Sequence, residues 1–564
     1  MVVPAPVIRR AAALVSVVVA VLAAPVATAA APPSLTEARA VAGVLAHERV
    51  ADWLDRYPPE PRTDASYAEE RGTWTVHVWS GKAGEVATGT VDDRTGFVTE
   101  AWTGPQVAWK MARGRPGAFG GKTLTSWPVW LLLTIVFVVG LADLRRPWSL
   151  RNLDLLALAS FGISLAFFDD GKVFQSVALA VPPSLYLALR AAWIGFRGRP
   201  LRPANPVWPI WLLAAATLFL VGFRVGLNVE GSSSVIDVGY AGVIGGHRIL
   251  DGQAPYGHMP VTDGREPCGA EGADGRIRER IQENGRCESA NARGDTYGPF
   301  AYLAYVPAVA AFGWDGKWDR LPAARATSIA FDLLTLLGLV LVGLRFGGKR
   351  LAAALAFGWA AYPFTAYALL ANTNDAIMPA TLVWGFWLAS SPGARGVAGA
   401  LAGWTKFAAL PTAPLWLTYP AGPTRHTAVR FGLGFGLATL GGFAMLLLEP
   451  SLGEALRVFW ERTLAFQIGR ESPFSIWGWG QYHAAGIPDL GVPQRVVQGA
   501  ALVLAGVAAA VPRRKGPLEL AALTAAILLA VQLSLTHWFY LYLPWVLPFV
   551  LLALLLPRTA DRAE

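Results

Sequence analysis

Two ionisable residues stand in unusual places along this sequence. Asp237 follows an apolar stretch by about eleven residues and directly precedes an apolar helix predicted at 238–250. Lys406 lies near the middle of the apolar stretch 397–418, where an ionisable group is costly to bury and is therefore a candidate for function. A carboxylate is able to take up a proton, and an ammonium group is able to hold an anion. The two positions are therefore the first candidates for chemistry.

Both residues also have a purely structural explanation. The Asp237 side chain suits the free amides at the start of the helix at 238–250, where an N-cap is expected. Lys406 would reach the membrane surface by snorkelling if 397–418 forms two short helices that meet at Thr405-Lys406. The sequence leaves both explanations open.

Other kinds of site are poorly supported. Cys268 and Cys287 lie 19 residues apart in one polar segment, which favours a disulfide over a metal site. No Cys- or His-rich cluster with metal-ligand spacing occurs, so we expect no metal. A phosphate-cradling Gly-x-x-x-x-Gly-Lys-Ser/Thr loop and a Gly-x-Ser-x-Gly elbow are also missing from the sequence.

The composition indicates which class of protein carries these residues. Of the 564 residues, 54% are apolar and only 15% are charged, whereas soluble proteins have about 25% charged residues. This excludes a soluble enzyme with one ordinary core, a disordered chain and a disulfide-dense scaffold. The net charge of +9 comes mainly from short loops between apolar stretches, which is typical of membrane topology and not of nucleic-acid binding.

Eleven apolar stretches approach or reach the length needed to cross a membrane, and basic loops between them predict their orientation. The stretches are 127–143, 153–168, 173–193, 207–226, 325–345, 351–371, 376–391, 430–448, 495–511, 517–534 and 537–556. With the basic loops in the cytoplasm, 397–418 as a hairpin and Tyr297–Trp314 as a surface-lying or re-entrant element, the segments 227–324, 372–375 and 449–494 lie together outside the cell. The predicted fold is therefore mostly α: a helical membrane bundle of about 11–13 spans with a small α+β extracytoplasmic domain at the N-terminus.

The N-terminal part divides into three segments. Residues 1–30 have the charged, apolar and small-residue regions of a signal peptide or signal anchor. Residues 31–122 form a polar domain with a helix predicted over 36–53 and strands predicted at 74–78, 86–90 and 97–98. This domain resembles PepSY-like extracytoplasmic domains, which implies binding or regulation without catalysis. A purely structural role is the alternative. Residues 123–206 are accessory transmembrane helices.

Residues 207–557 resemble the GT-C glycosyltransferases, and within them most closely the bacterial enzymes that use polyprenyl-phosphate sugars. Residues 558–564 would be a cytoplasmic tail. The resemblance starts with Asp237, Tyr240 and the Gly252–Tyr256 element, with its Pro255-Tyr256 pair. It continues with Tyr297-Gly298-Pro299-Phe300, Arg325, Asn372-Thr373-Asn374-Asp375 and the Gly-rich run Gly399–Phe407 that contains Lys406.

The resemblance implies transfer of a sugar, mannose in the best-known members, from a polyprenyl phosphate to an extracytoplasmic glycan, glycolipid or glycoprotein. Asp237 would be the general base, and no cofactor beyond the lipid-linked sugar is expected. Residues implied to bind substrate are Lys406, Arg224, Tyr240, Tyr256, Asp375, Arg470 and His483. Among these, Arg224 is alternatively an interface anchor, Asp375 a partner for a neighbouring helix and His483 part of an aromatic belt.

Two other functions fit the same sequence. One is a transporter or flippase of lipid-linked sugar, although the chain shows no internal repeat and its acidic residues gather outside the spans. The other is a membrane protein that binds glycan or lipid without catalysis.

Overall fold

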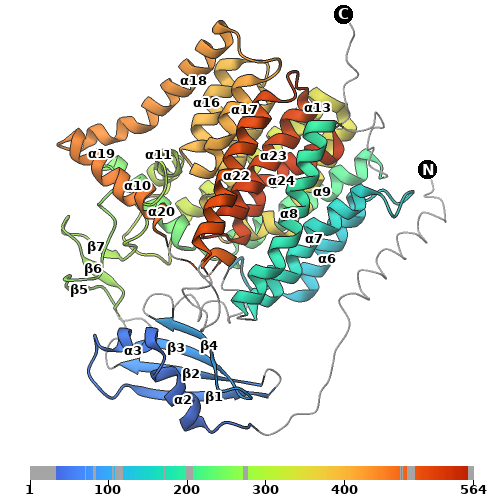
Figure 1. The fold of residues 1–564 in the computed structure, drawn as a ribbon. Coiled ribbons are helices and arrows are strands. Elements are labelled where there is room, and N and C mark those ends of the chain that lie inside the picture. The colour runs from blue at the N-terminus through green and yellow to red at the C-terminus, as the bar shows by residue number, and fades with distance from the viewer. Residues whose placement is uncertain are drawn as a thin grey trace, which may run out of the picture.

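The computed structural model describes residues 33–556, apart from 70–71, 81–83, 104–106, 108–118, 171, 199–207, 271–276, 471, 473 and 479–489. The predicted signal segment and the tail at 558–564 lie outside these residues. The chain forms a large helical bundle with a small antiparallel sheet domain at one end (Figure 1).

The sheet domain has four strands in chain order: β1 (Arg62–Ala68), β2 (Thr73–Ser80), β3 (Gly84–Asp92) and β4 (Val98–Thr103). Trp74, Val76 and Val78 alternate along β2 and are buried, as their spacing predicts. They pack with α2 (Glu37–Leu45) and α3 (Glu48–Leu54) in one core. The single helix predicted over 36–53 is wrong, because the chain breaks between α2 and α3.

The sheet domain also touches the bundle. Trp102 of β4 is fully buried, and its ring centre lies 6.1 Å from that of Phe174 in α8 (Val173–Arg197). Both residues belong to the core of the helical bundle and not to that of the sheet domain. The two parts of the molecule therefore share an apolar contact.

Within the described residues, seven helices are long and apolar enough to cross a membrane, so the chain is a helical, multi-pass membrane protein. They are Leu150–Asp169 (α7), Val173–Arg197 (α8), Ile210–Val229 (α9), Pro322–Ala361 (α13), Arg425–Leu448 (α18 and η5), Gly491–Ala510 (α22) and Pro517–Ser534 (α23). Shorter apolar helices are α6 (Trp127–Leu141), α14 (Pro363–Leu370), α15 (Ile377–Trp387) and α24 (Leu543–Leu555). The larger count of 11–13 spans stays a prediction.

Helix α13 explains part of the difference between the two counts. Its 40 residues contain Gly348, whose φ of +73° is a left-handed value that breaks the helix. The two stretches predicted at 325–345 and 351–371 therefore lie on either side of this break, and the second continues into α14.

The segment 397–418 folds into a hairpin, as predicted. Its arms are α16 (Pro392–Gly403) and a short η4 (Phe407–Thr412) followed by α17 (Ala413–Thr418). Arg395, near the start of α16, donates hydrogen bonds to the carbonyls of Trp416 (2.8 Å) and Tyr419 (2.7 Å) at the far end of α17. Because the two ends meet, Lys406 lies at the tip.

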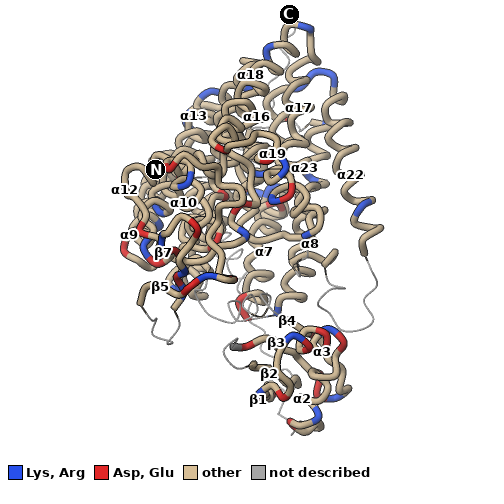
Figure 2. The backbone as a smooth tube through the Cα atoms, turned by 90° about the vertical axis from the view of Figure 1, so that its left-hand side faces the viewer, with Lys and Arg blue, Asp and Glu red and all other residues tan. Residues whose placement is uncertain are grey.

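The base of the hairpin belongs to a group of basic turns at the end of the bundle away from the sheet domain (Figure 2). Arg345 donates to the carbonyl of Trp387, and the Lys515 amide donates to the carbonyl of Pro420 over 2.7 Å. Several loops that are distant in sequence thus place their positive charges at one end.

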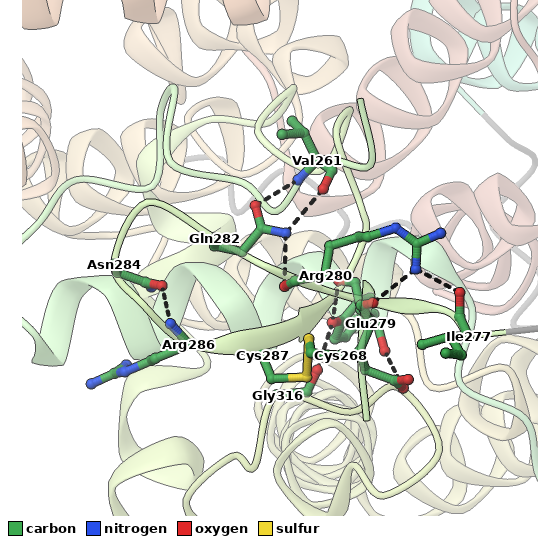
Figure 3. The surroundings of a disulfide bond; sticks show 12 residues. Val261, Cys268, Ile277, Glu279, Arg280, Gln282, Asn284, Arg286, Cys287 and Gly316 are labelled. Carbon is green, nitrogen blue, oxygen red and sulfur yellow. Dashed lines mark hydrogen bonds between the residues drawn. A yellow bond between two sulfur atoms is a disulfide. The ribbon is translucent and has the colours of Figure 1, made fainter. Parts of the chain in front are cut away.

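The segment between α9 and α13 forms a cap with its own small sheet. It contains α10 (Asp237–Leu250), the strands β5 (Pro267–Cys268), β6 (Glu279–Ile281) and β7 (Cys287–Ser289), and then α11 (Pro299–Leu303) and α12 (Val306–Phe312). The structure contains the predicted disulfide, which joins Cys268 and Cys287 across this sheet (Figure 3). Arg248 of α10 forms a buried ion pair with Glu288, which holds the sheet against the helix.

Replacing both Cys268 and Cys287 with serine is expected to destabilise the folded protein by about 3 kcal/mol, because the bond closes a loop between residues 19 apart. Thermal unfolding of the purified protein in detergent measures the effect. Wild-type protein under reducing conditions should show the same lowered midpoint. An unchanged midpoint in the double variant would mean that the covalent link adds nothing to the noncovalent contacts of the cap.

Candidate active site

The centre of the candidate site is a buried ion pair at the tip of the hairpin. Lys406 Nζ lies 3.1 Å from Asp375 Oδ1, and both side chains are almost completely buried. Asp375 belongs to the short turn η3 (Asn374–Ala376) between α14 and α15. Trp545 of α24 donates its indole N–H to the same carboxylate oxygen over 3.0 Å. Three separate parts of the bundle therefore converge on one carboxylate.

Aromatic rings surround the ammonium group. Lys406 Nζ lies 4.2 Å from the ring centre of Tyr297 and 5.5 Å from that of Trp545. Tyr542 stacks on Trp545 with ring centres 4.0 Å apart. The Phe300 amide donates to the carbonyl of Trp404 over 3.3 Å, which fixes the segment containing Tyr297 beside the hairpin tip. Cation–π contacts of this kind stabilise a desolvated cation.

A cavity of about 130 Å³ opens beside the ion pair. Its walls carry two cations, Lys406 and Arg470, together with His537, whose Nδ1 lies 2.8 Å from Ser472 Oγ. The other residues that line it are Thr296, Tyr297, Thr405, Phe407, Ala408, Gln467, Leu535, Thr536, Tyr542 and Trp545. Fixed cations with polar neighbours in a cavity of this kind suit a small anion such as a phosphate group.

Asp237 lies beside this site, at the first turn of α10. The backbone before it bonds to the C-terminal end of α14: the amides of Ser234 and Ile236 donate to the carbonyls of Leu370 (2.9 Å) and Ala371 (3.2 Å). These bonds hold the start of α10 next to the turn that carries Asp375. The Asp237 side chain is exposed to solvent.

The electrostatic surroundings agree with this placement. Burial raises the pKa of the Tyr297 phenol well above its ordinary value, and among nearby charges Asp237 and Asp375 raise it further while Arg470 lowers it. The charges of Asp237, Asp375 and Arg470 also act on Lys406. An exposed carboxylate and the buried cation therefore belong to one electrostatic unit.

Asp237 is not the N-cap of α10, so its alternative structural explanation does not hold. The helix begins at Asp237 itself, and its N-cap residue is Ile236. Among the described residues, no side chain forms a capping hydrogen bond at this end of α10. The Asp237 carboxylate is therefore not engaged as a cap, which was its main structural explanation.

Arg224 lies elsewhere, which corrects its prediction as a phosphate ligand. It is completely buried in α9, where its Nη2 lies 2.6 Å from Asp332 Oδ2 of α13, and it also donates to Thr365 Oγ1 over 3.2 Å. It is not among the described residues that line the cavity. Arg224 and Asp332 together satisfy two charges at a helix contact, which is a structural role.

Tyr240 and Tyr256 support the site without lining it, which corrects their prediction as substrate ligands. The buried Tyr240 hydroxyl donates to the carbonyl of Ser289 over 2.7 Å and so ties α10 to strand β7 of the small sheet. The Tyr256 hydroxyl donates to the carbonyl of Tyr297 over 3.0 Å. Tyr256 thereby holds the segment that places the Tyr297 ring over Lys406.

Of the remaining predicted residues, Lys406 and Arg470 line the cavity. Asp375 is the ion-pair partner of Lys406 and, like Asp237, is not among the described residues that line it. His483 lies outside the described residues. Sequence reasoning missed Gln467, His537, Tyr542 and Trp545. Gln467 belongs to a segment with no motif. His537, Tyr542 and Trp545 follow Ser534 in the stretch 537–556, which is predicted only as the last span. A signal was present in Thr536-His537, two polar residues between two apolar runs.

An ion pair between the partly exposed Arg462 and the buried Asp295 fixes the wall that carries Gln467 and Arg470. Asp295 is buried, accepts from Arg462 Nε over 2.7 Å and from the Gly257 amide over 2.8 Å, and immediately precedes Thr296 and Tyr297. Arg462 lies in η6 (Glu461–Ala465), a π-helical turn, and η6 leads into α20 (Phe466–Ile468). The pair thus joins both sides of the cavity wall.

Replacing Arg462 with lysine is expected to weaken binding of an anionic ligand at the cavity by about tenfold, because lysine retains the charge but not the forked geometry. Binding of a polyprenyl phosphate to purified protein measures the effect. Arg457→Lys is the matched control, since Arg457 lies on the preceding helix in an exposed ion pair. An equal loss of binding in both variants, or no loss of binding in either variant, would contradict a positioning role for Arg462.

No protein-family model, curated protein or solved structure matches this chain.

Proposed function

We propose that this protein is a membrane glycosyltransferase that moves a sugar, mannose by the sequence resemblance, from a polyprenyl phosphate to a hydroxyl group of an extracytoplasmic glycan, glycolipid or glycoprotein. The observation that carries the proposal is the cavity with Lys406 and Arg470 in its wall and the exposed carboxylate of Asp237 beside it. A leaving phosphate needs fixed cations, and an attacking hydroxyl needs a base. Both requirements are met within one small region.

The reaction follows from this arrangement. The Asp237 carboxylate takes the proton of the acceptor hydroxyl while its oxygen forms a bond to the anomeric carbon of the donor. The bond from that carbon to the phosphate oxygen breaks, and the phosphate leaves with its electron pair toward Lys406 and Arg470. Since the site offers one base and no covalent partner among the described cavity residues, we assign direct displacement with inversion.

Asp375 and the aromatic residues prepare the cation for this task. Asp375 holds the Lys406 ammonium group at a fixed point, and the rings of Tyr297 and Trp545 replace the water that it loses on burial. A preorganised cation of this kind needs little rearrangement when the phosphate charge develops. The lipid chain of the donor would remain in the membrane beside the bundle.

The basic turns support the placement of the site outside the cytoplasm. They gather at the end of the bundle away from the sheet domain, around Arg345, Arg395 and Lys515. By the positive-inside rule this end faces the cytoplasm. The PepSY-like domain would then lie outside with the catalytic cavity, as a binding or regulatory module.

The proposal is tested with purified protein in vesicles and radiolabelled polyprenyl-phosphate-mannose. Wild-type protein should release the sugar from the lipid to an acceptor or, slowly, to water. If no lipid-linked sugar is turned over but the labelled lipid crosses the vesicle membrane, the protein is a flippase. If the lipid binds with neither result, the protein is a binding protein and the proposed reaction is wrong.

A further inference from the structure

Helix α19 (Leu452–Trp460) leaves large apolar side chains uncovered. Leu452, Leu456 and Trp460 recur every fourth residue and so share one side of the helix. Their exposed fractions are 47%, 46% and 53%. Three neighbouring apolar side chains in water are unfavourable, at roughly 25 cal/mol for each Å² of exposed apolar surface. A cover for this surface is therefore expected.

The other two sides of α19 differ from the apolar one: one packs on protein and one carries charged residues. Ala455 and Phe459 are buried, and the Phe459 ring lies 5.0 Å from the rings of both Tyr256 and Phe443. On the third side, Arg457 forms exposed ion pairs with Glu454 and Glu461, the second at 2.7 Å. The helix thus has a side packed on protein, a charged side and an apolar side without a protein partner among the described residues.

Helix α19 directly follows a candidate span that has its own exposed apolar surface. The span Arg425–Leu448 exposes Leu433, Leu437, Leu440 and Leu447. Only Glu449, Pro450 and Ser451 separate this span from α19, and the Ser451 hydroxyl accepts a hydrogen bond from the Glu454 amide at the start of α19. The exposed apolar side chains of α19 therefore begin within one short turn of a helix that is suited to contact lipid.

We infer that α19 lies flat in the membrane interface on the side of the candidate active site, with the bilayer as the partner that covers it. Leu452, Leu456 and Trp460 enter the upper acyl region, and Glu454, Arg457 and Glu461 face water. A helix with apolar and charged sides separated in this way is typical of interfacial helices, and tryptophan is enriched at this depth. This inference does not depend on the proposed reaction.

The position of α19 has a consequence for the cavity. Helix α19 continues through η6 into α20, which contains Gln467, and Arg470 follows shortly after α20. Both residues belong to the cavity wall. A membrane-bound α19 therefore holds this wall at the level of the lipid headgroups. A ligand whose phosphate group lies at that level would reach Arg470 without leaving the bilayer.

Site-directed spin labelling of the full-length protein in phosphatidylcholine vesicles tests the inference. The chain has two cysteines, which are bonded to each other, so an introduced thiol is the only one that reacts. The variants are Leu456→Cys and, as the matched control one residue further along, Arg457→Cys. Each nitroxide is probed with oxygen, which concentrates in the bilayer, and with a water-soluble nickel chelate.

At residue 456, oxygen should relax the nitroxide several-fold more effectively, relative to the nickel chelate, than at residue 457. Equal exposure of both positions to the nickel chelate would overturn the inference, since α19 would then lie in water. Protection of residue 456 from both reagents, with spin–spin broadening between labels, would also overturn it and would assign the surface to a second copy of the chain. Glu461→Cys repeats the control if Arg457→Cys does not fold.

Discussion

Replacing Asp237 with asparagine is expected to reduce sugar transfer by about 10²- to 10⁴-fold, the range typical of losing a general base. Asparagine has nearly the same shape but cannot take up the proton of the acceptor hydroxyl. Folding should be unaffected, because the Asp237 side chain is exposed and forms no capping hydrogen bond among the described residues. The measurement is release of radiolabelled mannose from its polyprenyl phosphate at saturating donor.

Two comparisons make this result specific. Asp263→Asn removes an exposed carboxylate from the same segment between α9 and α13 and should leave turnover unchanged. Donor binding by Asp237→Asn should also remain near the wild-type value, since the phosphate contacts are assigned to Lys406 and Arg470. Equal turnover in wild type and Asp237→Asn would show that Asp237 is not the base.

Replacing Lys406 with methionine is expected to abolish transfer and also to destabilise the protein by about 3–5 kcal/mol, the usual cost of leaving a buried charge without its partner. Here that charge is Asp375, which is almost completely buried and, among the described residues, would keep only the indole N–H of Trp545 as a hydrogen-bond donor. Thermal unfolding in detergent measures the loss of stability, and the mannose release assay measures the loss of transfer.

A double variant separates the two effects. Asp375→Asn removes the carboxylate charge that Lys406→Met leaves unpaired, and it retains an oxygen that accepts a hydrogen bond from Trp545. The double variant Lys406→Met with Asp375→Asn should therefore recover most of the stability. Transfer should remain absent, because the cation that receives the phosphate is still missing. Arg457→Met, which breaks an exposed ion pair, should leave the stability nearly unchanged. Recovery of both stability and transfer in the double variant would assign Lys406 a purely structural role.

The sequence predicted the membrane bundle and the sheet domain because both depend on local patterns. Apolar runs identify candidate spans, and the alternation of Trp74, Val76 and Val78 identifies β2. The break at Gly348 and the separation of α2 from α3 were not predicted, since both depend on how neighbouring segments pack. The hairpin at 397–418 was predicted correctly because its central Lys406 cannot remain in the apolar core of a bilayer without a partner.

The site was predicted only in part, for the same physical reason. Asp237, Asp375, Lys406 and Arg470 each stand out locally as charges near apolar stretches. Arg224 stands out equally, yet its partner Asp332 is 108 residues away, and only the packing of α9 on α13 shows that the two neutralise each other. Tyr542 and Trp545 have ordinary membrane sequence around them, so nothing local distinguishes them from an aromatic belt, whereas His537 is marked only by its polar neighbour Thr536.

The hairpin that ends in Lys406 has a further consequence. Arg395 ties its base to the basic turns at one end of the bundle, whereas its tip carries Lys406 into the buried pair with Asp375. The two arms therefore connect the basic turns to the candidate site by one short stretch of chain. In the proposed orientation, we expect a protein or anionic lipid that binds the base from the cytoplasmic side to affect the proposed reaction through these arms.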